Sequence, residues 1–383
     1  MIEALIHGRI LCDEGLVTDR VVLIEAERIL DVVAPDDPRC ATASCRDLRG
    51  DLLLPGFIDV QVNGGGGVLF NDDPSVATIR TMAEAHRRFG TTSFLPTLIS
   101  DDLSVVARAI DAVHSAITNK VPGVIGVHLE GPFLNEARKG THDANKFRKL
   151  DSSAVALLSS LKVGRTLVTL APEMTTPDMI ASLAANGVVI SAGHTNATHA
   201  MIEQALRHGM TGFTHLFNAM SPLTSREPGV VGAALHDANS WCGIIVDGHH
   251  VSPLVLQIAL RCKRQDRFML VTDAMPNVGA AQNSFLLQGK KITVRDGKCV
   301  DEQGTLSGSA LDMASAVRNA VALLGIEIPQ AARMASTYPA QFLGLGHELG
   351  RIAPGYRANL VQADDQLNVR ETWIDGLSTA PRK

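Results

Sequence analysis

Four residues that can bind a metal or transfer a proton stand at the ends of short apolar runs. Glu130 and Asp273 close such a run, His194 directly follows one, and His215 lies near the end of another. Apolar runs of this length, separated by longer helical patterns, are typical of the buried parallel strands of an α/β barrel, whose carboxyl ends all meet at one face. A single residue of this kind is equally well explained as a helix cap or a hydrogen-bonded core residue. Four of them on separate strands favour one shared site.

The types of these residues indicate metal-assisted hydrolysis. Two histidines with one glutamate form a three-ligand catalytic set, which leaves a fourth position for water. A nearby carboxylate can accept the proton of that water and pass it on, so Asp273 is the predicted general base and acid. His142 and His250 lie on loops after predicted strands and are candidates for polarising the attacked carbonyl, with an ordinary surface histidine as the alternative for each.

Composition excludes several other classes of protein. The 383 residues carry 35 Lys and Arg against 40 Asp and Glu, and this balance argues against a nucleic-acid partner. A hydrophobic content of 45% is enough for a large core, while 4% aromatic residues are too few for a surface of stacked rings. The chain has no apolar run of about 18 residues and no signal-peptide pattern. Its six scattered cysteines lack a Cys-x-x-Cys pair, so we expect reduced thiols in a cytoplasmic protein without membrane contact.

The order of the predicted elements indicates a closed barrel. Eight strand patterns fall at residues 54–62, 92–97, 124–130, 166–171, 188–192, 211–216, 242–246 and 268–273. Helical patterns between them include 74–89, 103–117, 178–185, 199–208 and 253–261. This alternation predicts a (β/α)8 barrel of the TIM type. An open doubly wound sheet is the alternative, but no Gly-x-Gly-x-x-Gly follows the first strand. The glycines at 64–67 lack the Lys-Ser/Thr of a phosphate-binding loop.

Short β patterns flank this region on both sides. Residues 4–11, 21–25 and 28–33 precede it, and the run 357–361 in the tail is expected to pair with these N-terminal strands. Hairpin strands at 285–288, 291–294 and 298–300 follow the eighth strand, and helices are predicted at 310–324 and 329–342. The predicted division is therefore a small β-sandwich domain from residues 1–51 and 345–383, and a barrel from 52–344 with a β-hairpin insertion near 285–300.

Motifs along nearly the whole chain resemble the amidohydrolase superfamily, and within it the branch of amino-sugar-phosphate deacetylases. The matching segments are residues 55–64, 128–135, 192–198, 214–220, 226–229, 271–274, 304–309, 338–340 and 355–360. Pro-Gly-Phe-Ile-Asp marks only the superfamily, whereas His-Leu-Glu-Gly-Pro and Thr-His-Leu-Phe-Asn-Ala-Met are more specific. The resemblance implies hydrolysis of the acetyl group of N-acetylglucosamine 6-phosphate to give glucosamine 6-phosphate and acetate.

The resemblance also implies a role for individual residues. Glu130, His194 and His215 are the implied metal ligands, and Asp273 is the implied acid and base. The implied substrate contacts are Thr141, His142, Asn218, Ala219, Arg226, Asp247, Gly248, His249, His250, Leu306, Ser307 and Gly308. Arg226 and His250 would recognise the phosphate, since a guanidinium donates paired hydrogen bonds to phosphate oxygens. Because the family forms dimers, Arg226 is expected to reach the active site of the neighbouring subunit.

One departure from the superfamily pattern bears on the metal. Many members carry His-x-His at the end of the first strand and bind two metals, whereas this chain has Gln61 and Asn63 there. Amides are poor zinc ligands beside imidazole, so we expect one divalent metal per subunit and a weak or absent second site. Zinc is the first choice from the ligand set, and Fe2+, Co2+ or Mn2+ are the alternatives.

Two rival interpretations remain at the level of sequence. The chain could hydrolyse a different N-acyl substrate. An effect of Arg226 on KM that is confined to phosphorylated substrates would argue against this alternative. It could also be a scaffold that has lost its chemistry, although such a protein would be expected to lose the metal ligands that are present here.

Overall fold

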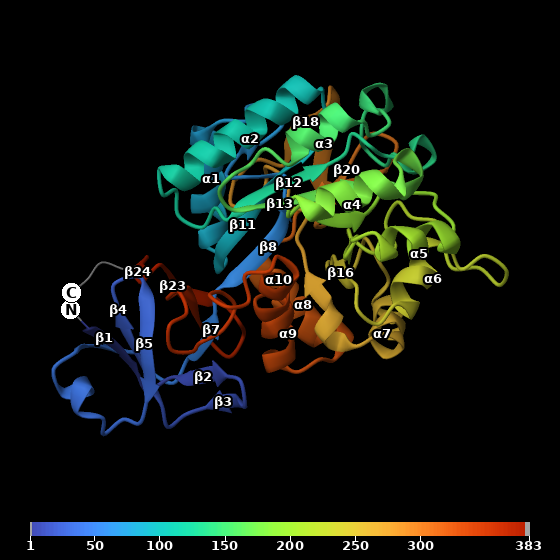
Figure 1. Ribbon diagram of the computed structural model, residues 1–383. Helices are drawn as coiled ribbons and strands as arrows, with labels where there is room; N and C mark the ends of the chain where they lie inside the picture. The colour runs from blue at the N-terminus through green and yellow to red at the C-terminus, as the bar shows by residue number, and fades with distance from the viewer. Residues whose placement is uncertain (1, 380–383) are drawn as a thin grey trace.

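The computed structural model describes residues 2–379 and contains a barrel of eight parallel strands (Figure 1). Each strand is hydrogen-bonded to the next in chain order. The strands are β8 (Phe57–Val62), β11 (Thr91–Ile99), β12 (Gly126–Glu130), β13 (Arg165–Leu170), β14 (Val189–Ala192), β15 (Gly212–Phe213), β16 (Trp241–Ile244) and β17 (Phe268–Leu270). The predicted (β/α)8 barrel is confirmed, and each of its strands coincides with a predicted one, with β15 and β17 shorter than expected. The bounds of the predicted first strand, 54–62, are wrong, because residues 54–55 belong to a separate strand of another sheet and β8 begins at Phe57.

The barrel closes between its first and last strands. Val62 forms a parallel bridge with Ala274, and the backbone N–H of Asp273 donates to the carbonyl of Gln61 at 3.0 Å. The N–H of Asn63 donates in turn to the carbonyl of Ala274 at 3.0 Å. This closure brings Asp273 next to Gln61 and Asn63, although more than 200 residues separate them.

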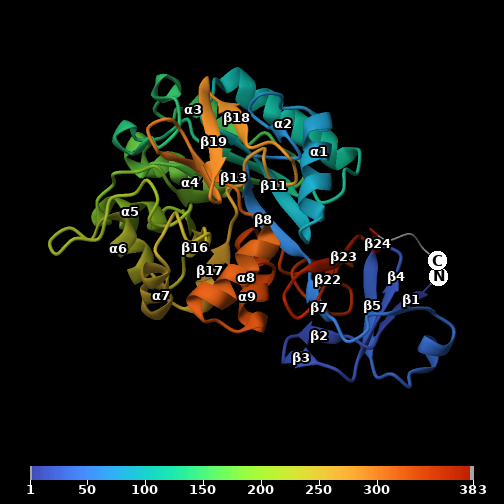
Figure 2. The same cartoon turned by 180° about the vertical axis from the view of Figure 1, so that it is seen from behind.

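Helices pack around the barrel, most of them on its outer side (Figures 1 and 2). They are α1 (Val76–Arg87), α2 (Leu103–Thr118), α3 (Ser152–Leu158), α4 (Pro177–Ala185), α5 (His199–Arg207), α6 (Gly229–His236), α7 (Pro253–Cys262), α8 (Met313–Leu324), α9 (Ile328–Met334) and α10 (Thr337–Phe342). The short α3 and α6 were not predicted. The single helix predicted at 329–342 is wrong, because Ser336 is non-helical with φ −139° and ψ −69°. The break places Pro339 in the first turn of α10, where its missing N–H is tolerated. Within residues 2–379, none of the helices is long and apolar enough to cross a membrane.

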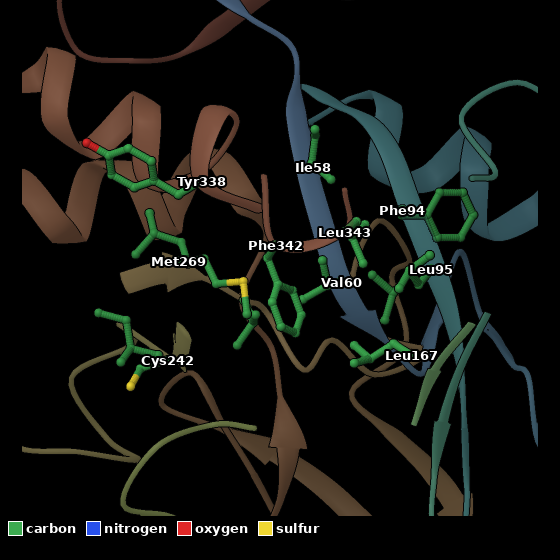
Figure 3. Packing of buried hydrophobic residues seen from close by; sticks show 14 of the residues in the cluster. Ile58, Val60, Phe94, Leu95, Leu167, Cys242, Met269, Tyr338, Phe342 and Leu343 are labelled. Atoms are coloured by element: carbon green, nitrogen blue, oxygen red, sulfur yellow. The ribbon is translucent and has the colours of Figure 1, made fainter. Parts of the chain in front are cut away.

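Helix α10 closes the end of the barrel opposite to the strand carboxyl ends. The ring of Phe342 lies between Val60 of β8 and Met269 of β17 (Figure 3). A Cβ on Gly212 would come within 2.8 Å of that ring, so only glycine leaves room for it here. The barrel interior is thus filled by side chains, which supports a rigid wall for the groups at its other end.

Both ends of the chain build a second unit beside the barrel (Figure 1). One sheet has the order β5-β4-β1-β6, with β1 (Ile2–Ile6), β4 (Val21–Glu25), β5 (Arg28–Val33) and β6 (Ser44–Asp47). The other has the order β24-β23-β22-β7-β2-β3, with β2 (Arg9–Cys12), β3 (Gly15–Val17), β7 (Leu52–Pro55), β22 (Leu360–Ala363), β23 (Val369–Ile374) and β24 (Leu377–Ser378). Side chains of both sheets, including Val22 and Trp373, form one buried cluster. The expected strand at 4–11 is split at His7, which has φ 57°.

The tail joins the N-terminal strands as expected. Strand β22 pairs with β7, and Arg357 forms an isolated bridge with Arg28. The division of the chain into two domains at the stated boundaries stays a prediction.

A four-stranded antiparallel sheet is inserted after the barrel's last strand. It consists of β18 (Ser284–Leu287), β19 (Lys290–Arg295), β20 (Lys298–Val300) and β21 (Leu306–Ser309), in that order. Sequence patterns had predicted the first three strands but not β21. They had also placed Gln288 in a strand, whereas it lies in the turn between β18 and β19.

Trp373 provides a test of how strongly the terminal sheets depend on their shared core. Its side chain is 0% exposed in the cluster between the sheets. We expect Trp373→Ala to lower the free energy of unfolding by about 3–5 kcal/mol, because it removes a large apolar side chain and leaves a cavity. Denaturant titration measures this change. Leu377→Ala, at a side chain that is 60% exposed, should change it by less than about 0.5 kcal/mol. Equal effects of the two substitutions would contradict this account of the core.

Candidate active site

The four residues first noted in the sequence meet at the carboxyl end of the barrel. Glu130 is the last residue of β12, His194 and His215 follow β14 and β15, and Asp273 follows β17. They therefore stand on the third, fifth, sixth and eighth barrel strands. His194, His215 and Asp273 have positive φ of 48°, 33° and 54°. Left-handed backbone is uncommon for residues other than glycine and is concentrated at functional sites.

Glu130, His194 and His215 form a compact group of possible metal ligands. Oε1 of Glu130 lies 3.1 Å from Nε2 of His194 and 3.0 Å from Nε2 of His215. The two Nε2 atoms are 3.1 Å apart. Tetrahedral coordination with bonds of about 2.0 Å needs ligand atoms about 3.3 Å apart. The three buried side chains therefore fit one divalent metal ion.

Hydrogen bonding around His194 supports the same arrangement. Nδ1 of His194 lies 2.9 Å from the carbonyl oxygen of Arg138 and must donate to it, which leaves the lone pair on Nε2 free for a metal. Burial disfavours the charge of Glu130, yet the neighbouring imidazoles of His194 and His215 hold the pKa of its carboxyl well below the ordinary value. Glu130 is thus an ionised ligand, as metal binding requires.

Asp273 is held beside this group by two amides. Its Oδ1 accepts hydrogen bonds from Nε2 of Gln61 at 3.1 Å and from Nδ2 of Asn63 at 2.6 Å. Gln61 also donates to Oε2 of Glu130 at 3.1 Å, so it links the base to the metal ligand. Burial and the negative charge of Glu130 raise the pKa of Asp273 to about 6. A carboxylate with such a pKa is suited to proton transfer near neutral pH.

Another buried carboxyl, that of Asp59, supports the segment that carries Asp273 and was not indicated by the sequence. Oδ2 of Asp59 accepts a 2.5 Å hydrogen bond from the hydroxyl of Thr272, and Oδ1 of Asp59 accepts from the N–H of Gln61 at 3.2 Å. Burial raises the pKa of Asp59 to about 7. Asp59 belongs to the Pro-Gly-Phe-Ile-Asp motif, but only the closed barrel shows that it joins the first strand to the last.

Thr141 and His142 lie on the loop after β12, and His142 enters the site. His142 is 4% exposed, and its ring centroid lies 4.4 Å from that of His194. Burial holds the pKa of His142 well below the ordinary value, so its imidazole is neutral. Nδ1 of His142 lies 2.8 Å from the hydroxyl of Ser100, a contact that the sequence did not indicate. The hydroxyl of Ser307 on β21 lies 3.3 Å from that of Thr141, so the inserted sheet also reaches this loop.

The other predicted contacts, apart from Arg226, lie on loops after the barrel strands and on strand β21 of the inserted sheet. Nδ1 of His250 lies 2.6 Å from Oδ2 of Asp247, while neighbouring Gly248 and His249 are exposed. Asn218 donates to the carbonyl of His215 at 3.1 Å. The remaining three residues are Ala219, with φ 51°, and Leu306 and Gly308 on β21.

Arg226 is the predicted residue that the single chain does not bring to the site. It is exposed on the loop before α6, which projects away from the barrel (Figures 1 and 2). The adjacent Glu227 is occupied locally, because its Oε1 accepts from the N–H groups of His199 and Gly229 at 2.9 Å each. Among residues 2–379 the side chain of Arg226 makes no hydrogen bond or ion pair, so it can contact a group outside its own chain.

The fold and the site together define a class of protein: a barrel hydrolase whose Glu-His-His group fits a divalent metal beside a carboxylate base. Comparison with known proteins agrees with this class, since residues 52–378 match the model of the amidohydrolase family. The chain belongs to the amidohydrolase family and is a hydrolase.

Individual relatives have more specific names. An N-acetylgalactosamine-6-phosphate deacetylase of Shewanella sp. (strain ANA-3) is 47% identical over 330 residues, which cover 86% of this chain and 83% of that protein. The crystal structure of an N-acetylglucosamine-6-phosphate deacetylase from Pasteurella multocida is 36% identical, covers 100% of both chains and gives a TM-score of 0.95. The deacetylase variant of Mycobacterium smegmatis in complex with N-acetyl-D-glucosamine 6-phosphate is 30% identical, covers 99% of this chain and 98% of its own, and gives a TM-score of 0.90.

Proposed function

We propose that this protein removes the acetyl group from N-acetyl-D-glucosamine 6-phosphate by hydrolysis, and so acts in amino-sugar metabolism. The observation that carries the proposal is the position of Asp273 beside the buried group of Glu130, His194 and His215. Full-length similarity to deacetylases of amino-sugar phosphates supports the choice of substrate. The products are D-glucosamine 6-phosphate and acetate.

The residues of the site have distinct tasks in this reaction. Oδ1 of Asp273 is held by Gln61 and Asn63, so Oδ2 is the oxygen that takes the proton as water adds to the amide carbonyl. Asp273 then gives this proton to the nitrogen, the C–N bond breaks, and the amine and acetate leave. His142 is neutral and donates a hydrogen bond to the carbonyl oxygen as negative charge develops there.

Glu130, His194 and His215 would hold one divalent metal, for which we propose zinc. A bound divalent ion lowers the pKa of a water molecule towards about 7 and can polarise a carbonyl. A weak or absent second site is supported by the orientation of Gln61 and Asn63, whose amide nitrogens face the carboxylates as donors.

Phosphate recognition completes the proposed site across a homodimer. Arg226 of one subunit would bind the substrate phosphate in the site of the other, together with His250, since Arg226 is exposed on a loop that projects away from its own barrel. We further propose that the enzyme is cytoplasmic, without a membrane or nucleic-acid partner, which six free cysteines support.

The phosphate proposal makes a direct prediction. Arg226→Ala should raise KM for the phosphorylated sugar by about 10- to 100-fold, because it removes a charged hydrogen-bonding partner, while turnover of the unphosphorylated sugar stays unchanged. Steady-state kinetics with both sugars measures this. Mixed dimers of the Arg226→Ala and Asp273→Asn chains should recover part of the wild-type activity. In such a dimer, one of the two sites combines the intact Asp273 of one chain with the intact Arg226 of the other. Equal effects on both sugars, or no recovery on mixing, would contradict the shared site.

N-acetyl-D-galactosamine 6-phosphate, the C4 epimer of the proposed substrate, is a second candidate substrate. It is favoured by the 47% identity to the deacetylase of N-acetylgalactosamine 6-phosphate. Acetate release from each purified sugar phosphate, compared as kcat/KM, decides between them. Preference for another N-acetylated compound would reject both, and the absence of bound metal together with inactivity would indicate a scaffold that has lost its chemistry.

A further inference from the structure

The side chain of Gln288, in the inserted sheet, joins two segments at the edge of the site. Its Nε2 donates to the carbonyl of Ser100 at 2.9 Å, and its Oε1 accepts from the N–H of Asp143 at 2.7 Å. Ser100 directly follows barrel strand β11, and Asp143 directly follows His142. One amide therefore connects the barrel wall to the loop of His142.

Ser100 in turn fixes the imidazole of His142. The backbone N–H of Ser100 points at Nδ1 of His142 from 3.4 Å, and the hydroxyl of Ser100 is 2.8 Å from the same atom. A backbone N–H can only donate, so Nδ1 must be the acceptor. In a neutral imidazole the proton is then on Nε2, and this tautomer makes His142 a hydrogen-bond donor on its other side.

The turn that carries Gln288 gives independent evidence for a role of its side chain. Leu287 pairs with Lys290, so Gln288 and Gly289 form a two-residue loop, with φ of 48° and 82°. Positive φ at both positions is the type I′ turn, which prefers Asn, Asp or Gly in the first position. The other tight turn of the inserted sheet, Asp296-Gly297, follows this preference. Glutamine is energetically unfavourable at this turn position. Backbone strain of this kind indicates that the residue is needed for the contacts of its side chain outside the turn.

We propose that Gln288 is a positioning residue that holds the loop of His142 against the end of β11 and thereby keeps the Nε2–H of His142 available to the substrate carbonyl. Only a glutamine has an amide long enough to reach both Ser100 and Asp143 from this turn. The part played by His142 in turnover rests on the proposed function, whereas its tautomer does not.

The test uses a substitution that improves the turn and shortens the side chain. Gln288→Asn gives the preferred Asn-Gly turn, but its amide is about 1.5 Å shorter and cannot keep both hydrogen bonds. In the metal-loaded enzyme we expect kcat to fall by about 10-fold or more, with KM within about threefold and with Tm unchanged or higher. Gln303→Asn, at an exposed glutamine of the same insertion, should leave kcat, KM and Tm unchanged.

A double substitution separates positioning from general structure. If Gln288 acts through His142, adding Gln288→Asn to His142→Ala should cause no further loss of kcat. If the two residues acted independently, the fold-losses of kcat from the two substitutions would multiply. An unchanged kcat in Gln288→Asn, or multiplied losses in the double variant, would overturn the proposal.

The tautomer can be read without any substrate. Nitrogen-15 spectra of histidine-labelled enzyme, with the His142 signals identified by their loss in His142→Gln, should show protonated Nε2 in the wild type and a mixture of tautomers in Gln288→Asn. If the protein hydrolyses no sugar phosphate, this spectrum still decides the proposal while the proposed function fails. Identical His142 signals in both proteins would overturn it.

Discussion

Replacing Asp273 by Asn should reduce acetate release by about 10³-fold or more while the protein stays folded and keeps its metal. The amide has the size of the carboxyl group and can still accept hydrogen bonds from Gln61 and Asn63 through its oxygen. It cannot take a proton from water or return one to the leaving nitrogen, and general acid–base catalysis contributes about 10²- to 10⁴-fold. The loss should therefore appear in kcat, with KM changed by less than about threefold.

Three measurements make this prediction specific. Acetate release gives the rate, metal analysis should find the same content as in the wild type, and thermal unfolding should show a similar Tm. Asp178→Asn, at an exposed residue in the first turn of α4, controls for the loss of one negative charge and should retain full activity. If Asp273→Asn and the wild type release acetate at equal rates, the assignment of Asp273 as acid and base is wrong.

Removal of the metal should cause the second large effect. Treatment with a chelator such as EDTA, followed by its removal, should lower activity by at least about 100-fold, and one equivalent of Zn2+ per chain should restore it. Without the ion, two imidazole nitrogens 3.1 Å apart face Glu130 with no cation between them. Binding to the folded state alone should also raise the free energy of unfolding, by about 4 kcal/mol at a free metal concentration 1,000 times Kd.

Substitution of a ligand tests whether the metal sits where the geometry indicates. His215→Asn should bind less than one metal per chain and should not recover activity with stoichiometric zinc. His114→Asn, at an exposed histidine of α2, should behave as the wild type. Full metal content in His215→Asn would place the ion elsewhere, and undiminished activity after complete removal of metal would exclude metal-assisted hydrolysis.

Much of this site was predictable because it depends on local patterns repeated along the chain. Apolar runs with period and length typical of buried strands located the barrel wall. In a parallel barrel all carboxyl ends lie at one face, so residues at the ends of four runs could be expected to meet. Glu130, His194, His215 and Asp273 indeed stand on the third, fifth, sixth and eighth strands. Composition served mainly to exclude classes of protein, because a net charge of −5 and an aromatic content of 4% are compatible with many different hydrolases.

Prediction failed where neighbouring elements override a local pattern. The run at 329–342 has a continuous helical pattern, but the chain breaks at Ser336 so that α10 can turn and bury Phe342 in the barrel. Gln288 continues the alternation of β18, but pairing of Leu287 with Lys290 forces it into a turn. In both cases the local conformation is set by contacts with other segments, and the periodicity of one segment does not predict such contacts.

The sequence by itself therefore determined the barrel, the flanking strands and the identity of the groups that can bind a metal or move a proton. Only the tertiary structure decided how those groups are held: Oδ1 of Asp273 by Gln61 and Asn63, and Nδ1 of His142 by Ser100. These contacts span tens to hundreds of residues and depend on the register at which the barrel closes. A hydrogen bond requires its two atoms to come within about 3 Å, and the spacing of residues along one strand or helix does not specify such a distance to another.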